Sequence, residues 1–128
     1  AMVSRFKRID HVALHVGDLA RSIEFYEKNF GFRHYFQHAA GGGHQIAYLK
    51  LGDTVLELTH YPNGSAMAGF HFCLEVEQVE AAVTELQAAG VAMVRAPHDT
   101  AAREEREQGW RRVVFRGPDG EQIELRGK

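Results

Sequence analysis

The sequence repeats itself, and this repeat limits the folds that the chain can form. The segment 10–16 (DHVALHV) matches the segment 70–76 (FHFCLEV), since both alternate apolar and polar residues and carry a histidine at their second position. In each half an amphipathic helical pattern follows and reaches a glycine, and a short strand with one glutamate closes the half. The helical patterns cover 19–31 and 79–90, and the closing strands cover 55–58 and 122–125. The repeat predicts two similar modules of βαβββ order.

The first module begins with an alternating strand and a helix that has clear end signals. Asp18 offers a side-chain oxygen as N-cap, and Gly31 ends the apolar helical face of Leu19, Ile23 and Tyr26. The run of alanine and glycine at 39–43 predicts a flexible loop without regular structure. The strands expected in this module cover 9–16, 32–37, 44–51 and 54–60, the last two forming a hairpin around Gly52 and Asp53.

The second module repeats this order after an expected linker at 61–69. Its expected strands cover 70–76, 91–95, 111–116 and 121–126. A polar connection at 96–110 is longer than most loops in compact domains, and we expect a helical turn over 101–106 within it. A solvated excursion and an active-site lid are both open interpretations of this connection.

Composition narrows the class of partner. The chain has 128 residues, enough for one domain, with module one at about 7–61 and module two at about 69–126. Lys and Arg number 15 against 17 Asp and Glu, and no basic block is present, so the sequence does not indicate binding to nucleic acid or to a membrane. We expect a small-molecule substrate. The single cysteine, Cys73, and the lack of a signal or membrane-length apolar run favour a cytoplasmic location.

Four polar residues occupy equivalent places in the two modules. His11, Glu57, His71 and Glu124 each lie in a strand whose neighbouring residues are apolar. Because side chains alternate between the faces of a strand, the apolar neighbours are expected under the helices and the four polar residues on the opposite face. If the two sheets curve around a shared hollow, that hollow receives two imidazoles and two carboxylates.

Two imidazoles and two carboxylates suit a divalent ion of the group Zn, Ni, Co, Mn and Fe. An ion that accepts five or six ligands would keep positions open for a substrate, which favours catalysis over a structural site. Any one of these residues alone would instead be interpreted as an ordinary surface or hydrogen-bonded side chain. The coincidence of four equivalent positions favours the metal site.

Several segments carry a resemblance to a known family. The sequence IDHVAL at 9–14, the residues Asp18 and Leu19, NFGF at 29–32, VLEL at 55–58 and GPDGEQIEL at 117–125 resemble the vicinal oxygen chelate superfamily. That superfamily includes glyoxalase I, methylmalonyl-CoA epimerase, extradiol dioxygenases and antibiotic-resistance proteins. The resemblance implies an α+β fold of two tandem βαβββ modules that form a curved sheet around a metal-binding cavity.

Within the superfamily, the set of His11, Glu57, His71 and Glu124 is similar to the ligand set of glyoxalase I. The resemblance implies a Ni- or Zn-dependent lyase, a homodimer, that isomerises the hemithioacetal of a 2-oxoaldehyde and glutathione through an enediolate. It further implies that Glu124 is the proton-transfer base and that Glu57 mainly anchors the ion. Two alternatives stay open: an epimerase or other lyase that acts on an α-acidic carbonyl compound, and a non-catalytic protein that binds a drug or metabolite.

Overall fold

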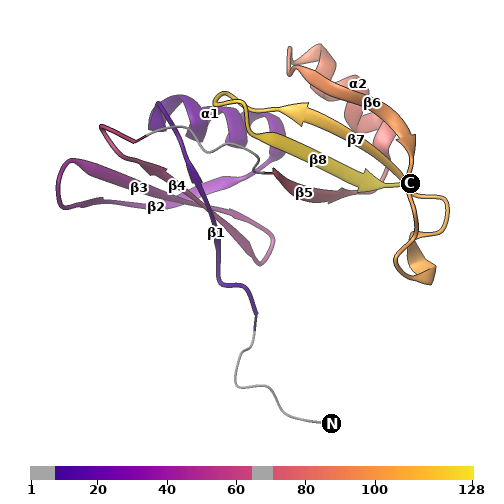
Figure 1. The fold of residues 1–128 in the computed structure, drawn as a ribbon, viewed down its shortest axis with the longest axis horizontal. Helices are drawn as coiled ribbons and strands as arrows, with labels where there is room; N and C mark the ends of the chain where they lie inside the picture. Colours follow the sequence, from indigo (N-terminus) through magenta and orange to yellow (C-terminus); the bar gives the residue numbers. More distant parts are fainter. Residues whose placement is uncertain (1–7, 65–70) are drawn as a thin grey trace, which may run out of the picture. The chain divides into compact units, whose positions relative to one another are not determined.

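The computed structural model describes residues 8–64 and 71–128 of the chain (Figure 1). The chain divides into two compact units, residues 1–66 and 67–128, and each has the predicted order βαβββ. The first unit contains β1 (Val12–His15), α1 (Leu19–Phe30), β2 (Arg33–Ala40), β3 (His44–Leu51) and β4 (Thr54–His60). The second contains β5 (His71–Val76), α2 (Val79–Ala88), β6 (Met93–Asp99), the 3-10 turn η1 (Glu105–Glu107), β7 (Arg111–Arg116) and β8 (Gln122–Gly127).

Each unit contains one four-stranded sheet, and the two sheets have the same topology. The strand orders are β1-β4-β3-β2 and β5-β8-β7-β6. The first strand of each unit pairs in parallel with the last, which places Ala13 opposite Glu57 and Cys73 opposite Glu124. The sequence repeat is therefore a repeat in the register of the sheet. This α+β arrangement confirms the predicted fold class.

The helices begin and end for local reasons. In α1 the side chain of Asp18 accepts a hydrogen bond of 3.0 Å from the backbone N–H of Arg21, and Gly31 ends the helix with φ of 73°. In α2 the N-cap residue, Gln78, makes no side-chain cap bond, and the helix ends at Ala88, before the glycine expected to stop it. Hydrophobic burial has to hold α2 in place, and its buried residues are Val79, Val83 and Leu86.

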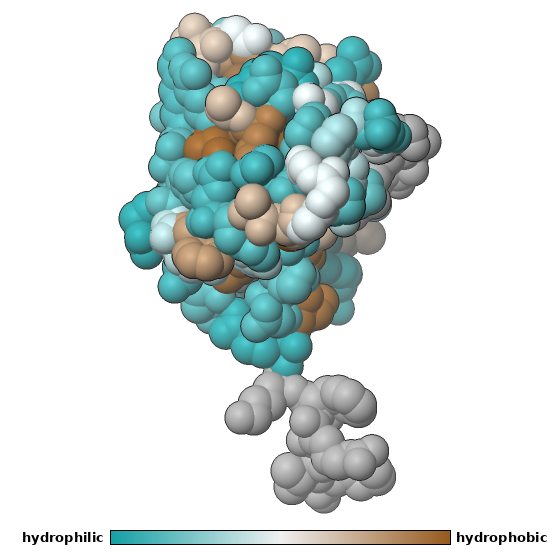
Figure 2. Space-filling model, turned by 90° about the vertical axis from the view of Figure 1, so that its left-hand side faces the viewer, coloured by the Kyte–Doolittle hydropathy of each residue, from teal (hydrophilic) through white to brown (hydrophobic). Residues whose placement is uncertain are grey.

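Each unit has its own apolar core between its helix and its sheet. Tyr26 and Leu58 in the first unit, and Phe115 and Ile123 in the second, are fully buried. On the face drawn in Figure 2 the surface is mostly hydrophilic, and hydrophobic residues form small separate patches. None of the helices in residues 8–64 and 71–128 is long and apolar enough to cross a membrane.

Two connections differ from the sequence expectation. The predicted loop at 39–43 is shorter, because Ala39 and Ala40 continue β2 and pair with Gln45 and His44. Gly42 and Gly43 adopt φ of 77° and 80°, so the chain reverses in a tight turn and pairing continues up to it.

The second difference concerns the long connection. The expected strand at 91–95 is β6 (Met93–Asp99), which takes the first four residues of the segment 96–110. Pro97 is tolerated there because β6 is the edge strand of its sheet. The helical turn lies at Glu105–Glu107 instead of 101–106. Of the expected linker at 61–69, residues 61–64 form a turn, and 65–69 lie outside the described residues, as does Phe70 of the expected strand.

Candidate metal centre

Each unit brings one histidine close to one glutamate. His11 Nε2 lies 3.8 Å from Glu57 Oε2, and His71 Nε2 lies 3.7 Å from Glu124 Oε2. In both units the histidine stands two residues before the residue that pairs directly with the glutamate. The two pairs are therefore built alike, although His71 is the first residue of β5 and His11 immediately precedes β1 instead of lying in the expected strand.

The predicted division between the faces of the closing strands is confirmed. Leu56 and Leu58, on either side of Glu57, are buried, as are Ile123 and Leu125 on either side of Glu124. The glutamate side chains are 14% and 11% exposed, while those of His11 and His71 are 38% and 59% exposed. Sheltered carboxylates beside accessible imidazoles form sites that a small ligand can reach from one side.

The pair of His11 and Glu57 is held by one carboxylate and two hydroxyl groups. His11 Nδ1 lies 2.9 Å from Asp10 Oδ2, and this contact fixes the ring with Nε2 toward Glu57. The hydroxyl of Thr59 donates to Glu57 Oε2 at 3.4 Å. Tyr48, which lies opposite Glu57 in β3, has a raised pKa, first because of its hydrogen bond with Glu57 and then because of burial. Glu57 is thus held by two hydroxyl groups.

The second pair has a cationic neighbour instead. Arg112 Nε donates to Glu124 Oε1 at 2.6 Å, and Arg112 Nη1 lies 3.3 Å from His98 Nε2. The two oxygens of Glu124 are therefore divided between Arg112 and His71. Cys73, opposite Glu124, has its pKa raised to about 11 by burial of the thiol and by the carboxylate of Glu124, so it is not a ready nucleophile at neutral pH.

The side chains of the two His–Glu pairs are donors of the type that bind a divalent ion. Two donors bound to one ion at about 2.1 Å lie about 3.0 to 3.4 Å apart in octahedral or tetrahedral geometry. The pairs at 3.8 and 3.7 Å need to close by less than about 1 Å to reach that range. Within residues 8–64 and 71–128, no three His, Cys, Asp or Glu side chains gather around one point. Each unit by itself therefore presents one pair of donor side chains of a type that can bind such an ion.

A buried carboxylate in the long connection was not expected from the sequence. The Glu107 side chain is 1% exposed and accepts hydrogen bonds from Arg103 and from Arg126 Nη2, the latter at 3.0 Å. Arg103 lowers the pKa of Glu107 to about 2. Trp110 is also buried, under the guanidinium groups of Arg106 and Arg126. The spacing of Arg103 and Glu107 by four residues was the only sequence signal for this cluster.

Comparison with known proteins places the chain in a family. Residues 8–125 match the Glyoxalase/Bleomycin resistance protein/Dioxygenase superfamily. A probable lactoylglutathione lyase from Vibrio cholerae serotype O1 is 32% identical over 130 aligned positions, which cover 92% of this chain and 88% of that protein. The chain belongs to the Glyoxalase/Bleomycin resistance protein/Dioxygenase superfamily.

Two further similarities show the breadth of this family. Mitochondrial methylmalonyl-CoA epimerase from Homo sapiens is 34% identical over 95 residues, which cover 62% of this chain and about half, 52%, of the epimerase. The crystal structure of TnmS3, an antibiotic binding protein from Streptomyces sp. CB03234, superposes with a TM-score of 0.79 at 23% identity and covers 98% of each chain. This last similarity confirms the fold alone.

Proposed function

We propose that the chain is a metal-dependent lyase of the glyoxalase I type. Its substrate would be the hemithioacetal of a 2-oxoaldehyde and glutathione, which it would convert into the thioester of a 2-hydroxy acid. The observation that carries this proposal is the pair of matched His–Glu contacts, at 3.8 and 3.7 Å, in equivalent positions of two repeated units. The similarity to the probable lactoylglutathione lyase over most of both chains supports it.

In this proposal His11, Glu57, His71 and Glu124 bind one ion, Ni or Zn, with Co, Mn or Fe as other candidates. The ion, when bound, would polarise the substrate carbonyl and so acidify the adjacent C–H. Two neutral imidazoles and two carboxylates balance its double positive charge. The contact between Asp10 and His11 supports this assignment, because a carboxylate on the far nitrogen is common among metal-binding histidines.

The two glutamates would have different roles. A carboxylate that acts as base needs a partner when it turns away from an ion, and Arg112 offers Glu124 such a partner at 2.6 Å. Glu124 would take the proton from the carbon beside the carbonyl and return it to the neighbouring carbon. Glu57, held by Thr59 and Tyr48, would keep its position and anchor the ion.

An epimerase is the second candidate, because human methylmalonyl-CoA epimerase is 34% identical over 95 residues. Such an enzyme would remove and return a proton on one carbon of an α-acidic thioester. The same base and the same ion would serve both reactions, so the substrate distinguishes them.

The deciding experiment is a turnover assay against a panel of metals. The purified chain is loaded with Ni, Zn, Co, Mn or Fe and supplied with methylglyoxal and glutathione, or with a chiral α-carboxyacyl thioester in deuterated water. Thioester formation in the first assay supports the lyase, and deuterium incorporation in the second supports the epimerase. A metal-loaded protein inactive in both would contradict the proposal. A protein that binds no metal would favour a non-catalytic binding protein.

A further inference from the structure

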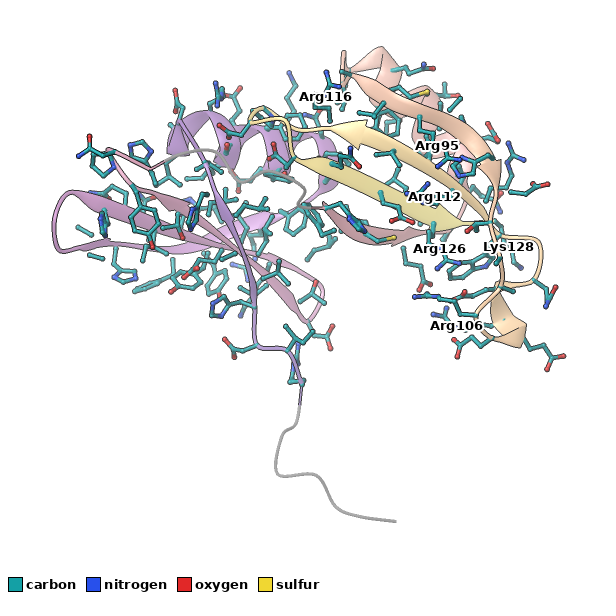
Figure 3. All side chains as sticks on the ribbon, in the orientation of Figure 1. Arg95, Arg106, Arg112, Arg116, Arg126 and Lys128 are labelled. Atoms are coloured by element: carbon teal, nitrogen blue, oxygen red, sulfur yellow. The ribbon has the colours of Figure 1, made fainter. Side chains whose placement is uncertain are left out.

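Four arginines lie on the sheet face of the second unit that carries Glu124. Arg112 and Arg126 stand directly opposite each other in β7 and β8, and Arg95 stands opposite Val114, next to Glu124. Arg116 shares this face because it lies four residues after Arg112 in the same strand. Figure 3 shows Arg95, Arg112 and Arg126 along the β6, β7 and β8 part of this sheet.

Two of these arginines are not solvated surface charges. The side chains of Arg112 and Arg126 are 24% and 10% exposed. Two like charges directly opposite each other in an antiparallel pair destabilise a sheet unless anionic groups lie near them. Arg112 and Arg126 therefore require negative charge at this place.

The carboxylates near these four arginines do not balance their positive charge. Glu124 accepts from Arg112 and has its other oxygen beside His71, and Glu107 is shared between Arg126 and Arg103. Arg95 and Arg116 form no ion pair with residues 8–64 or 71–128. The face therefore carries more guanidinium groups than carboxylates.

Some guanidinium nitrogens of these arginines also have no hydrogen-bond acceptor. Arg112 uses Nε for Glu124 and Nη1 for His98, and its Nη2 makes no hydrogen bond with the described parts of the chain. The Nε of Arg126 is buried and has no hydrogen-bond partner there either. Buried guanidinium donors are normally satisfied, so the buried Nε of Arg126 indicates a missing acceptor, and Nη2 of Arg112 is an unused donor in the neighbouring strand.

We infer that Arg112 and Arg126 bind an anionic oxygen group of the substrate, a carboxylate or a phosphate, directly beside Glu124. Guanidinium groups suit planar or tetrahedral oxyanions because they present several N–H donors in a fixed geometry. The inference rests on the proposed function for the identity of the ligand as a substrate. It adds that the anionic group lies beside Glu124, since Arg112 would contact both. That group would be a carboxylate of glutathione in the hemithioacetal, or the α-carboxylate in the substrate of the epimerase candidate.

The inference is tested by titrating succinate and inorganic phosphate into the full chain, metal-loaded and metal-free, with calorimetry and the NMR signal of the Arg112 Nε–H as readouts. The wild type should bind at least one probe and shift that signal. Arg112→Gln should weaken binding by about tenfold or more, the scale of a lost charge-assisted hydrogen bond. Tighter binding of succinate would identify a carboxylate site, and tighter binding of phosphate a phosphate site.

Arg111→Gln is the matched control, since Arg111 lies in the same strand on the opposite face and binds Glu80 and Asp99. It should bind the probes as the wild type does. If Arg112→Gln fails to fold, Arg112→Lys is used instead. Lysine keeps the positive charge but lacks the planar guanidinium, so this variant should still bind the probes more weakly than the wild type.

Equal binding by the wild type and the folded Arg112 variant, or no binding of either probe to the wild type, would overturn the inference. Metal content measured on the same samples separates this result from the proposed function. A chain that binds the anion through Arg112 but holds no metal would contradict only the proposed function. A chain that holds metal and ignores the anion would contradict only the inference.

Discussion

The difference between the two glutamates originates in single cross-strand neighbours. Glu57 has Tyr48 opposite it in β3, whereas Glu124 has Val114 opposite it in β7, with Arg112 two residues before Val114 in that strand. A hydroxyl and a guanidinium stabilise a carboxylate to different extents, because only the guanidinium carries a full charge. Two residues that are equivalent in the repeat are therefore expected to differ in chemistry.

Glu124→Gln tests this difference. Glutamine keeps the shape and one oxygen donor but removes the basicity, so the variant should retain a measurable share of metal and lose turnover by about two orders of magnitude or more. Glu57→Gln is the comparison and should lose proportionally more metal than turnover per bound ion. Turnover near the wild-type value in metal-loaded Glu124→Gln would show that Glu124 is not the base.

At the scale of elements, the segment that follows β6 is held by one buried carboxylate. Its length and polarity left a solvated excursion and an active-site lid open, and in the structure Glu107 and Trp110 anchor it to the end of β8 through Arg126. Glu107→Gln should weaken this anchor, so hydrogen exchange across 100–110 should become faster than in the wild type. Glu105→Gln, an exposed position in the same turn, is the control and should leave exchange unchanged.

The same carboxylate predicts how stability depends on pH. The pKa of Glu107 is lowered from 4.5 to about 2, so the folded state binds its proton less readily than the unfolded state. This stabilisation is present above pH 4.5 and is lost as the pH falls toward 2. Denaturant unfolding measured across this range should show a smaller loss of stability in Glu107→Gln than in the wild type. Parallel pH profiles for the two proteins would contradict this role.

Sequence patterns predicted the interior strands better than the edge strands. The bounds of β3, β4 and β7 agree with the expectation, because turn residues such as Gly52 and Asp53 mark their ends. The edge strands β2 and β6 are longer than expected, because pairing with β3 and β7 sets their length and their side chains are mostly exposed. The edge strand β1, expected at 9–16, is shorter and covers Val12–His15. An exposed strand has no apolar alternation to reveal its end.

Strand alternation in the sequence also predicted part of the candidate site. Alternation along the strands places Glu57 and Glu124 on the face opposite the core, since only strand parity is needed. The contacts of Glu124 with Arg112 and of Arg126 with Glu107 depend on strand register and on a connection between strands. Neither is encoded in local spacing, so the sequence alone did not predict these contacts.

At the scale of the whole molecule, the proposed function has His11, Glu57, His71 and Glu124 bind one ion. Each unit supplies a single His–Glu pair, and one pair alone is a weak metal site. A metal that binds the folded chain through these four residues should raise its melting temperature in proportion to the logarithm of metal concentration. Thermal unfolding with increasing Ni or Zn measures this, and a melting temperature that does not respond to any metal would contradict it.

A homodimer in the cytoplasm remains a prediction, and sedimentation of the purified chain tests the dimer.

The most direct test of the central claim is the metal content of the chain by elemental analysis, in the wild type, His11→Ala and His71→Ala. His44→Ala is the control, because His44 forms no ion pair with residues 8–64 or 71–128. About one divalent ion per chain is expected in the wild type and in His44→Ala. Loss of most of the metal is expected in each of the other variants, although their substitutions lie in different units. Unchanged metal content in both His11→Ala and His71→Ala would contradict the account.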